Sequence, residues 1–270
     1  MRYIVVLLMW IVTPALAADR VSFEGQITQG GLVLGKAPSG TRVTFEDRVL
    51  RVSAEGRFVF GLGRDHGASA TLAFVYPDGT RETRSFELRP RKFDIQRING
   101  LPPAMVEPNA KDLERIKADN VAIGRARARD SAEALWGGEW IWPVTGRISG
   151  VYGSQRILNG KPRRPHFGVD VAMPTGTPIV APADGIVSLA HPDLYFTGGT
   201  IILDHGHGVG SLYAHLSAVD VQEGQRVKRG ETIGNIGATG RVTGAHLHWG
   251  MTWYAINIDP ALVVPPMPQP

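Results

Sequence analysis

Short runs of alternating apolar and polar residues, separated by turn residues, occupy the chain from residue 21 to about residue 101. A period of two is typical of strands that bury one face, and the turn residues between the runs favour antiparallel hairpins. The pattern predicts a small antiparallel β-sandwich at residues 18–103, because the paired prolines Pro102 and Pro103 end the segment. The runs lie at residues 21–25, 42–45, 57–61, 71–76 and 84–88.

The spacing of apolar residues changes in the next segment, a linker at residues 104–137. Residues 109–136 predict one long helix, with acidic residues in the first turn and two glycines after the end. The apolar positions form a narrow stripe, which is typical of a helix that rests on the surface of a domain. Arg125, Arg127 and Arg129 are two residues apart and so spread around the helix, which favours a solvated charged face over a nucleic-acid site.

Glycine-punctuated apolar runs return at residues 138–264, and no helical period accompanies them. This pattern predicts a second β domain, built from short and tightly turned antiparallel strands. The fold class is therefore mainly β, with an N-terminal sandwich, a long linker helix and a C-terminal antiparallel domain. The proline-rich tail at residues 265–270 predicts disorder.

The first 17 residues have the parts of a secretory signal peptide: a basic residue, a short apolar run and an Ala-x-Ala end. The apolar run is shorter than the roughly 20 residues that a membrane span needs. We therefore expect cleavage after Ala17 and an exported protein, in the periplasm or otherwise secreted or wall-associated, with no stable membrane anchor. Because the chain has no cysteine, its stability must come from packed cores, and about 250 residues are enough for two of them.

The charge balance is mildly basic. The 270 residues include 29 Lys and Arg against 25 Asp and Glu, and the net charge of +4 falls by one to +3 when Arg2 leaves with the signal peptide. Such a balance is compatible with an anionic polymer as partner but does not identify one. No aromatic platform or nucleic-acid motif accompanies the basic residues, so we expect no nucleic-acid partner. The oligomeric state stays open.

Histidines are concentrated in the second β segment, where seven of the eight lie between positions 166 and 248. In a strand, His246 and His248 share one face while Leu247 points into the core on the other. His215 lies in a further apolar, strand-like run. Since the chain lacks cysteine, a zinc site here would use imidazole and carboxylate ligands, which are typical of catalytic zinc.

An earlier stretch supplies a histidine and a carboxylate, His166 and Asp170. Four residues span about 13 Å on a straight strand, which is too far for two side chains to bind one ion. The backbone must therefore bend between them, and Gly168 lies where a bend costs least.

The other histidines favour ordinary structural roles. His66 and His191 are expected in loops, His66 with a solvated side chain. His205 and His207 lie in a glycine-rich turn and are read as structural or solvated, although a different fold could bring His207 to a metal.

Three basic residues precede His166, in what the pattern indicates is a loop. They are either ordinary solvated charges, the reading we favour, or contacts for carboxylates of a peptide substrate. These residues are Lys161, Arg163 and Arg164.

The motifs His-x-x-x-Asp, Tyr-Ala-His-Leu and His-Leu-His, in that order, resemble the lysostaphin-type (M23) zinc metallopeptidases, which include LytM-like cell-wall endopeptidases. The resemblance runs from about residue 142 to about residue 264. It implies that His166, Asp170 and His248 bind one Zn²⁺ per chain. It also implies that His215 and His246 are catalytic, with His246 as general base and His215 as stabiliser or proton relay, although these two roles could be exchanged.

Two functions follow from this resemblance. The first is a zinc metalloendopeptidase that hydrolyses peptide cross-links of peptidoglycan by metal-activated water, with stem peptides or cross-bridges as its partners. The alternative is a non-catalytic LytM-like regulator that binds cell wall or activates another hydrolase. Regulators of that kind typically lack zinc ligands, whereas all five positions are filled here, which favours the enzyme. The role of the N-terminal sandwich, as a wall-binding module, lid or spacer, and the scissile bond are not determined.

Overall fold

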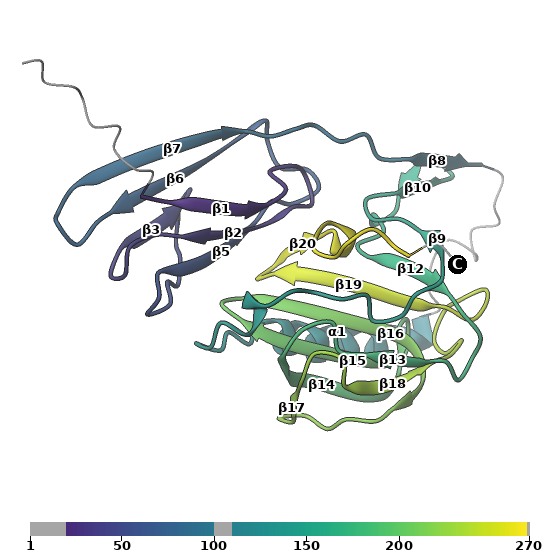
Figure 1. Ribbon diagram of the computed structural model, residues 1–270. Coiled ribbons are helices and arrows are strands. Elements are labelled where there is room, and N and C mark those ends of the chain that lie inside the picture. Colours follow the sequence, from purple (N-terminus) through teal and green to yellow (C-terminus); the bar gives the residue numbers. More distant parts are fainter. Residues whose placement is uncertain (1–19, 100–109, 269–270) are drawn as a thin grey trace, which may run out of the picture.

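The computed structural model describes residues 20–99 and 110–268 (Figure 1). The expected signal peptide at residues 1–17 lies outside these ranges. Strands make up most of the described elements, so the prediction of a mainly β fold is confirmed. Among the helices of the described part, none is both long enough and apolar enough to cross a membrane.

The N-terminal part folds into two small antiparallel sheets, with strand orders β1-β2-β5 and β4-β3-β6-β7. Phenylalanines from both sheets meet between them, since Phe23 of β1 contacts Phe86 of β7 with ring centroids 4.9 Å apart, and Phe58 of β5 contacts Phe74 of β6 at 6.1 Å. This is the packing of a small sandwich. The strands are β1 (Ser22–Gly25), β2 (Leu32–Lys36), β3 (Arg42–Phe45), β4 (Arg48–Val49), β5 (Arg57–Gly61), β6 (Ser69–Val75) and β7 (Arg81–Glu87).

The strand that follows the sandwich pairs with the C-terminal half of the chain instead. β8 (Ile95–Ile98) lies parallel to β10 (Gln155–Leu158), which pairs in turn with β11 (Lys161–Pro162). The segment that the sequence assigns to one domain at residues 18–103 therefore contributes its last strand to a sheet of the next. The long-range pairing of β8 with β10 decides which sheet this strand joins, because the sequence of β8 is compatible with either part of the chain.

The linker helix is shorter than the sequence predicts. After the 3₁₀ turn η2 (Ala110–Asp112), helix α1 spans Leu113–Arg127, and the expected end near Trp136 lies instead in the 3₁₀ helix η3 (Leu135–Gly137). The residues between are held in an irregular path by the C-terminal sheet, because the Ser131 backbone N–H donates to Asp204 Oδ2 at 3.2 Å and the Ser131 carbonyl accepts from the His207 N–H at 3.0 Å. These long-range bonds replace the helical ones.

The C-terminal part is built on one large antiparallel sheet of order β17-β14-β15-β16-β19-β12-β9. β18 pairs with β16 and β13, β20 pairs with β19, and η4 (Pro260–Leu262) follows. The strands are β9 (Arg147–Gly150), β12 (Val169–Ala172), β13 (Pro178–Val180), β14 (Gly185–Leu194), β15 (Gly198–Gly206), β16 (Val209–Val219), β17 (Arg226–Val227), β18 (Thr232–Ile236), β19 (Leu247–Trp253) and β20 (Ile256–Ile258).

The two faces of this sheet have different neighbours. One face supplies Tyr213, Leu247 and Trp249 to the main hydrophobic core. The other carries Leu212 and Ala214, which form a smaller cluster beneath α1, so the helix rests on the sheet as predicted (Figure 1). Directly opposed residues of antiparallel strands lie on the same face, and Ala214 is paired with His248. The helix and His248 therefore share a face.

The sandwich packs against the end of β19 and against β20. Phe45 contacts Trp253 at 5.8 Å between ring centroids, and a Cβ on Gly61 would lie 2.7 Å from both Trp253 and Ile258. As a result, the buried residues of the sandwich and of the sheet form one continuous cluster, where the sequence suggested two cores. Trp253 is five residues from His248, about 17 Å along the strand, so this contact is remote from the histidines.

The described part of the tail is ordered. Trp142 Nε1 donates to the Pro265 carbonyl at 2.8 Å, and Met267 packs against the main core. Residues 265–268, for which the sequence pattern predicts disorder, are therefore held against the core through Pro265 and Met267.

Candidate metal centre

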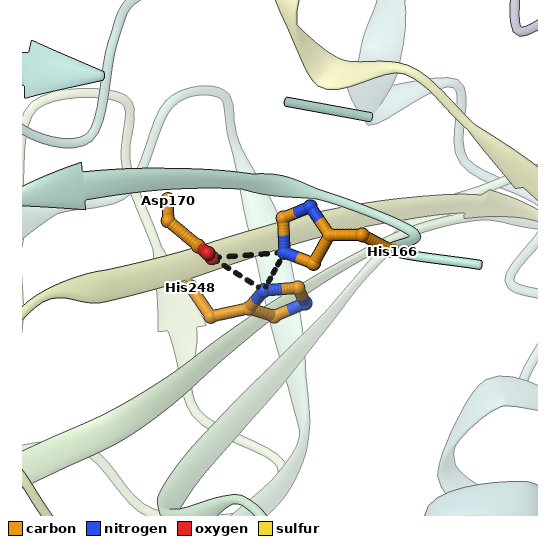
Figure 2. Close-up of side chains that lie close together, drawn as sticks. All are labelled: His166, Asp170 and His248. Carbon is orange, nitrogen blue, oxygen red and sulfur yellow. Dashed lines mark hydrogen bonds and ion pairs between the residues drawn. The ribbon is translucent and has the colours of Figure 1, made fainter. Parts of the chain in front are cut away.

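Three side chains from distant segments converge on one face of the sheet (Figure 2). His166 Nε2 lies 3.0 Å from Asp170 Oδ1 and 3.0 Å from His248 Nδ1, and His248 Nδ1 lies 2.8 Å from Asp170 Oδ1. Within residues 20–99 and 110–268, these three form the one group of histidine and acidic side chains with the spacing of a metal site. Ligands at about 2.0–2.2 Å from a tetrahedral zinc ion lie roughly 3.3 Å from one another, which is close to this spacing.

The pairing of two strands sets two of the three ligand positions. Asp170 of β12 lies opposite His248 of β19, so both side chains leave the same face of the sheet. Leu247, between the two histidines of the His-x-His motif, is fully buried on the other face, as the alternation predicts. The sequence pattern thus correctly assigns the facing of this strand.

His166 precedes β12 and is positioned by the loop before it. The His166 backbone N–H donates to the Ser154 carbonyl at 2.8 Å, and the His166 carbonyl accepts from the Gly153 N–H at 2.8 Å. The imidazole Nδ1 is 3.0 Å from the Val151 carbonyl, which can only accept, so Nδ1 carries the proton and donates it. In the neutral ring Nε2 then presents its lone pair to Asp170 and His248, as a metal ligand does.

Two glycines make room for the ligands. A Cβ on Gly168 would lie 2.5 Å from the Trp249 carbonyl and 2.7 Å from the ring of His248. A Cβ on Gly150 would lie 2.3 Å from Asp170 Oδ2. The sequence assigns Gly168 to a bend, but the residue has no left-handed backbone conformation, and close approach of β19 is the reason for glycine there. Nothing in the sequence pattern singles out Gly150.

The electrostatics of the three ligands favour a bound cation. Burial alone would raise the pKa of the Asp170 carboxyl, but hydrogen bonds with His166 and His248 outweigh it and hold that pKa well below its usual value. Burial lowers the pKa of His248. Burial also opposes protonation of His166, but Asp170 overcomes this effect and raises its pKa. An ionised carboxylate therefore faces two imidazole nitrogens, and three acceptor atoms at this spacing fit a divalent cation.

Two further histidines flank the three ligands. The rings of His215 and His246 lie 4.8 Å apart between centroids, and His246 Nε2 is 3.8 Å from Asp170 Oδ1. His215 Nδ1 donates to the Thr239 carbonyl at 3.0 Å and His246 Nδ1 donates to the Gly244 carbonyl at 2.9 Å, so Nε2 carries the lone pair in both neutral rings. Burial lowers the pKa of His215 to about 4, so this imidazole is neutral at pH 7.

His215 reaches this position through a β-bulge. Gly199 pairs with Leu216 and Ile201 with Tyr213, so Ala214 and His215 together oppose one residue of β15. His215 has φ of 67°, a conformation that is uncommon for a residue with a side chain, and its N–H donates to the Thr197 carbonyl at 2.7 Å. A bulge redirects the side chain that follows it. On a regular strand His215 would share the core face of Tyr213.

The remaining histidines lie outside this group. His205 is fully buried between Asp184 and Ser211, and His207 is buried against Trp136, so both are structural and His207 does not reach the metal centre. His191 accepts from the Asp193 N–H at 3.1 Å. His66 is not simply solvated, because its Nε2 lies 3.1 Å from Glu46 Oε1 and its side chain is only 12% exposed.

Near His166, Lys161 and Arg164 are exposed, as expected for solvated charges, whereas on the helix Arg127 departs from that prediction. Lys161 lies in β11, and Arg164 places its guanidinium 5.3 Å from the ring of Phe167. On α1, Arg125 is exposed, but Arg127 buries its Nε. Sequence reasoning missed Arg127, although its spacing of four residues from the sheet-facing Ile123 places it on the same side of the helix.

The structure is therefore an antiparallel sheet that carries a candidate metal centre of two histidines and an aspartate, flanked by two more histidines. Its sequence and fold are similar to those of known proteins. Residues 164–260 match peptidase family M23. The chain is 42% identical over 106 residues to the peptidoglycan DD-endopeptidase ShyA of Vibrio cholerae, which is 38% of this chain and 24% of ShyA. It is 35% identical over 151 residues to the cell division protein DipM of Caulobacter vibrioides, which is 53% of this chain and 24% of DipM.

A solved structure supports the same relationship over more of the chain. A candidate M23 peptidase of Pseudomonas aeruginosa is similar with a TM-score of 0.67 and 29% identity, over 88% of this chain and 95% of that one. Residues 164–260 form a peptidase M23 domain, and the resemblance inferred from the motifs is confirmed. The chain spans about a quarter of the length of the two curated relatives.

Proposed function

We propose that this protein is a zinc metalloendopeptidase that hydrolyses peptide cross-links of peptidoglycan, as an exported protein in the periplasm. The convergence of His166, Asp170 and His248 within 3.0 Å of one another carries the proposal. These three residues would hold the ion, and the imidazole and carboxylate donor set suits zinc. A zinc ion bound there supplies a Lewis acid that makes water a nucleophile near neutral pH and polarises the substrate carbonyl.

His246 and His215 perform the proton transfers in this proposal. His246 accepts a proton from the attacking water at Nε2 and returns it to the leaving amine, while its Nδ1 keeps the bond to the Gly244 carbonyl. His215 is neutral at pH 7 and accepts or relays a proton at Nε2. Since both rings present the same nitrogen, the assignment of His246 as base rests on its distance of 3.8 Å from Asp170.

The names of the relatives support peptidoglycan as the substrate class. ShyA, which is 42% identical to this chain over 106 residues, is named a peptidoglycan DD-endopeptidase. The filled ligand set gives the non-catalytic regulator no support, because such a protein has no need of three converging metal donors. Stem peptides or cross-bridges of peptidoglycan are therefore the partners that we propose.

The test uses purified protein with zinc measured by mass spectrometry and cross-linked muropeptides as substrate. We expect one zinc per chain and cleavage of the cross-link in the wild type, and loss of both in His166→Ala. The control is His191→Ala, a histidine outside the metal centre, which should keep both. Stoichiometric zinc in His166→Ala, or a wild type that binds zinc but leaves every muropeptide intact, would contradict the proposal.

A further inference from the structure

Arg127 is a half-buried cation with a fully buried Nε, and the proposed mechanism does not use it. It lies in the last turn of α1, one turn after Ile123, which packs against the sheet. Its Nε is buried and has no hydrogen-bond partner in the described part of the chain, and no ion pair of Arg127 is found there. Even partial burial of an unpaired guanidinium is unfavourable, so an anionic group that contacts Arg127 would be stabilising.

The last turn of α1 lies on the metal face of the sheet. Ala126, next to Arg127, belongs to the buried cluster that also contains Leu212 and Ala214 of β16. In the neighbouring strand β19, Ala214 is paired with His248 and Leu212 with Gly250. Since opposed residues share a face, the end of α1 covers the same surface as the metal ligand His248.

The segment around His166 also lies against this surface. A Cβ on Gly250 would lie 2.9 Å from the Phe167 carbonyl, so the backbone at Phe167 crosses over Gly250 on the metal face. Arg164 lies three residues earlier, with its guanidinium over the Phe167 ring. Leu212 and Gly250, which are opposed on one face of the sheet, thus connect the cluster beneath the end of α1 with the segment that carries Arg164.

The two guanidinium groups act on each other. Burial lowers the pKa of Arg127 to about 10, and the positive charge of Arg164 lowers it further in the same direction. No carboxylate of the described residues forms an ion pair with either group. Arginine binds planar carboxylates through two parallel hydrogen bonds, which makes it suited to a carboxylate ligand.

We propose that Arg127, together with Arg164, binds a carboxylate of the peptide substrate next to the scissile bond and makes the enzyme selective for acidic peptides. This inference rests on the proposed function, since the carboxylate arrives with the substrate of the metal centre. It assigns a specificity role to the linker helix, which lies outside the family match at residues 164–260.

The test compares two cross-linked muropeptides that differ only in whether the stem carboxylate nearest to the scissile bond is free or amidated. We expect the wild type to cleave the free form with kcat/KM about tenfold or more above the amidated form, as one charge-assisted contact provides. Arg127→Met should bring this ratio close to one. The control Arg125→Met changes an exposed arginine of the same helix and should keep the wild-type ratio.

Two further measurements separate specificity from folding. Arg164→Met alters an exposed side chain and should lower the ratio about threefold without changing the melting temperature. Arg127→Met should melt, without substrate, at or above the wild-type temperature, because an unpaired buried charge is removed. A wild type that cleaves both forms equally, or an Arg127→Met that keeps the preference, would overturn the inference but leave the proposed function intact. A wild type that cleaves neither form would overturn both.

Discussion

Two histidine clusters on the same sheet differ in how their hydrogen-bonding atoms are matched. In the buried cluster, Tyr213 donates to Ser211 Oγ at 2.7 Å, Ser211 donates to His205 Nε2 at 2.7 Å, and His205 Nδ1 donates to the Asp184 carbonyl at 2.6 Å. Each donor meets one acceptor. The Asp184 carbonyl fixes the tautomer of His205, and this tautomer sets the direction of the other two hydrogen bonds. The cluster is complete without a ligand.

In the metal centre, by contrast, donors and acceptors are not matched. The bond of His166 Nδ1 to the Val151 carbonyl leaves two acceptor atoms, His166 Nε2 and Asp170 Oδ1, facing each other and His248 Nδ1. The neutral rings can supply at most one proton, on His248, for the three contacts between these atoms. A buried histidine is therefore structural where donors and acceptors alternate, and a ligand where acceptors converge.

Removal of a converging acceptor should have the largest effect. We expect His248→Ala to reduce peptide hydrolysis about a thousandfold or more, because the ion and the chemistry that it supplies are lost together. A chelator should lower the melting temperature of the wild type, since a bound ion stabilises only the folded state, and should leave that of His248→Ala unchanged. Activity assays and thermal melts with and without chelator check this expectation. Equal chelator shifts in both proteins would show that the ion binds elsewhere.

Removal of the buried histidine should instead affect stability. His205→Ala leaves Ser211 and the Asp184 carbonyl without a partner and creates a cavity, so we expect the free energy of unfolding to fall by about 3 kcal/mol. Zinc content and kcat/KM of the folded protein should stay within about twofold of the wild type. Urea titrations measure the first quantity, with His191→Ala as the control that should change stability by less than about 0.5 kcal/mol. Loss of zinc from folded His205→Ala would contradict the distinction between the clusters.

The smallest effect concerns pH. Burial lowers the pKa of His205 to about 4 from an ordinary 6.5, so between these values the unfolded chain binds a proton that the folded protein does not. Stability therefore falls as pH drops from 6.5 towards 4, by up to about 1.4 kcal/mol for each pH unit from this group. Urea titrations of metal-free protein at pH 6 and pH 5 give the loss of unfolding free energy between these two pH values. We expect this loss to be about 1 kcal/mol smaller in His205→Ala than in the wild type. An equal loss of unfolding free energy in both proteins would show that His205 is not the group responsible.

Much of the metal centre could be predicted from the sequence, because the direction of a side chain along a strand depends on local backbone geometry. Alternation along a strand places His246 and His248 on one face and Leu247 on the other, whatever the strand packs against. The spacing of His166 and Asp170 likewise requires that the backbone between them leave a straight strand if they are to meet. The mainly β class follows from the same short periods.

Other features required contacts between distant parts of the chain. The bulge that redirects His215 depends on its pairing with β15, and the early end of α1 depends on bonds from Ser131 to the C-terminal sheet. Gly168 appears in the sequence as a place to bend, but the structure shows that the approach of β19 requires it.

The sequence by itself determined which residues could bind a metal and that His246 and His248 share a face opposite Leu247, because side-chain direction in a strand follows from backbone periodicity. Only the tertiary structure decided that the Nε of Arg127 is buried, that His205 is satisfied and that the sandwich packs at Trp253, away from the metal centre. Burial and the matching of hydrogen bonds are properties of pairs of segments, and the order of residues along one segment does not specify its partner.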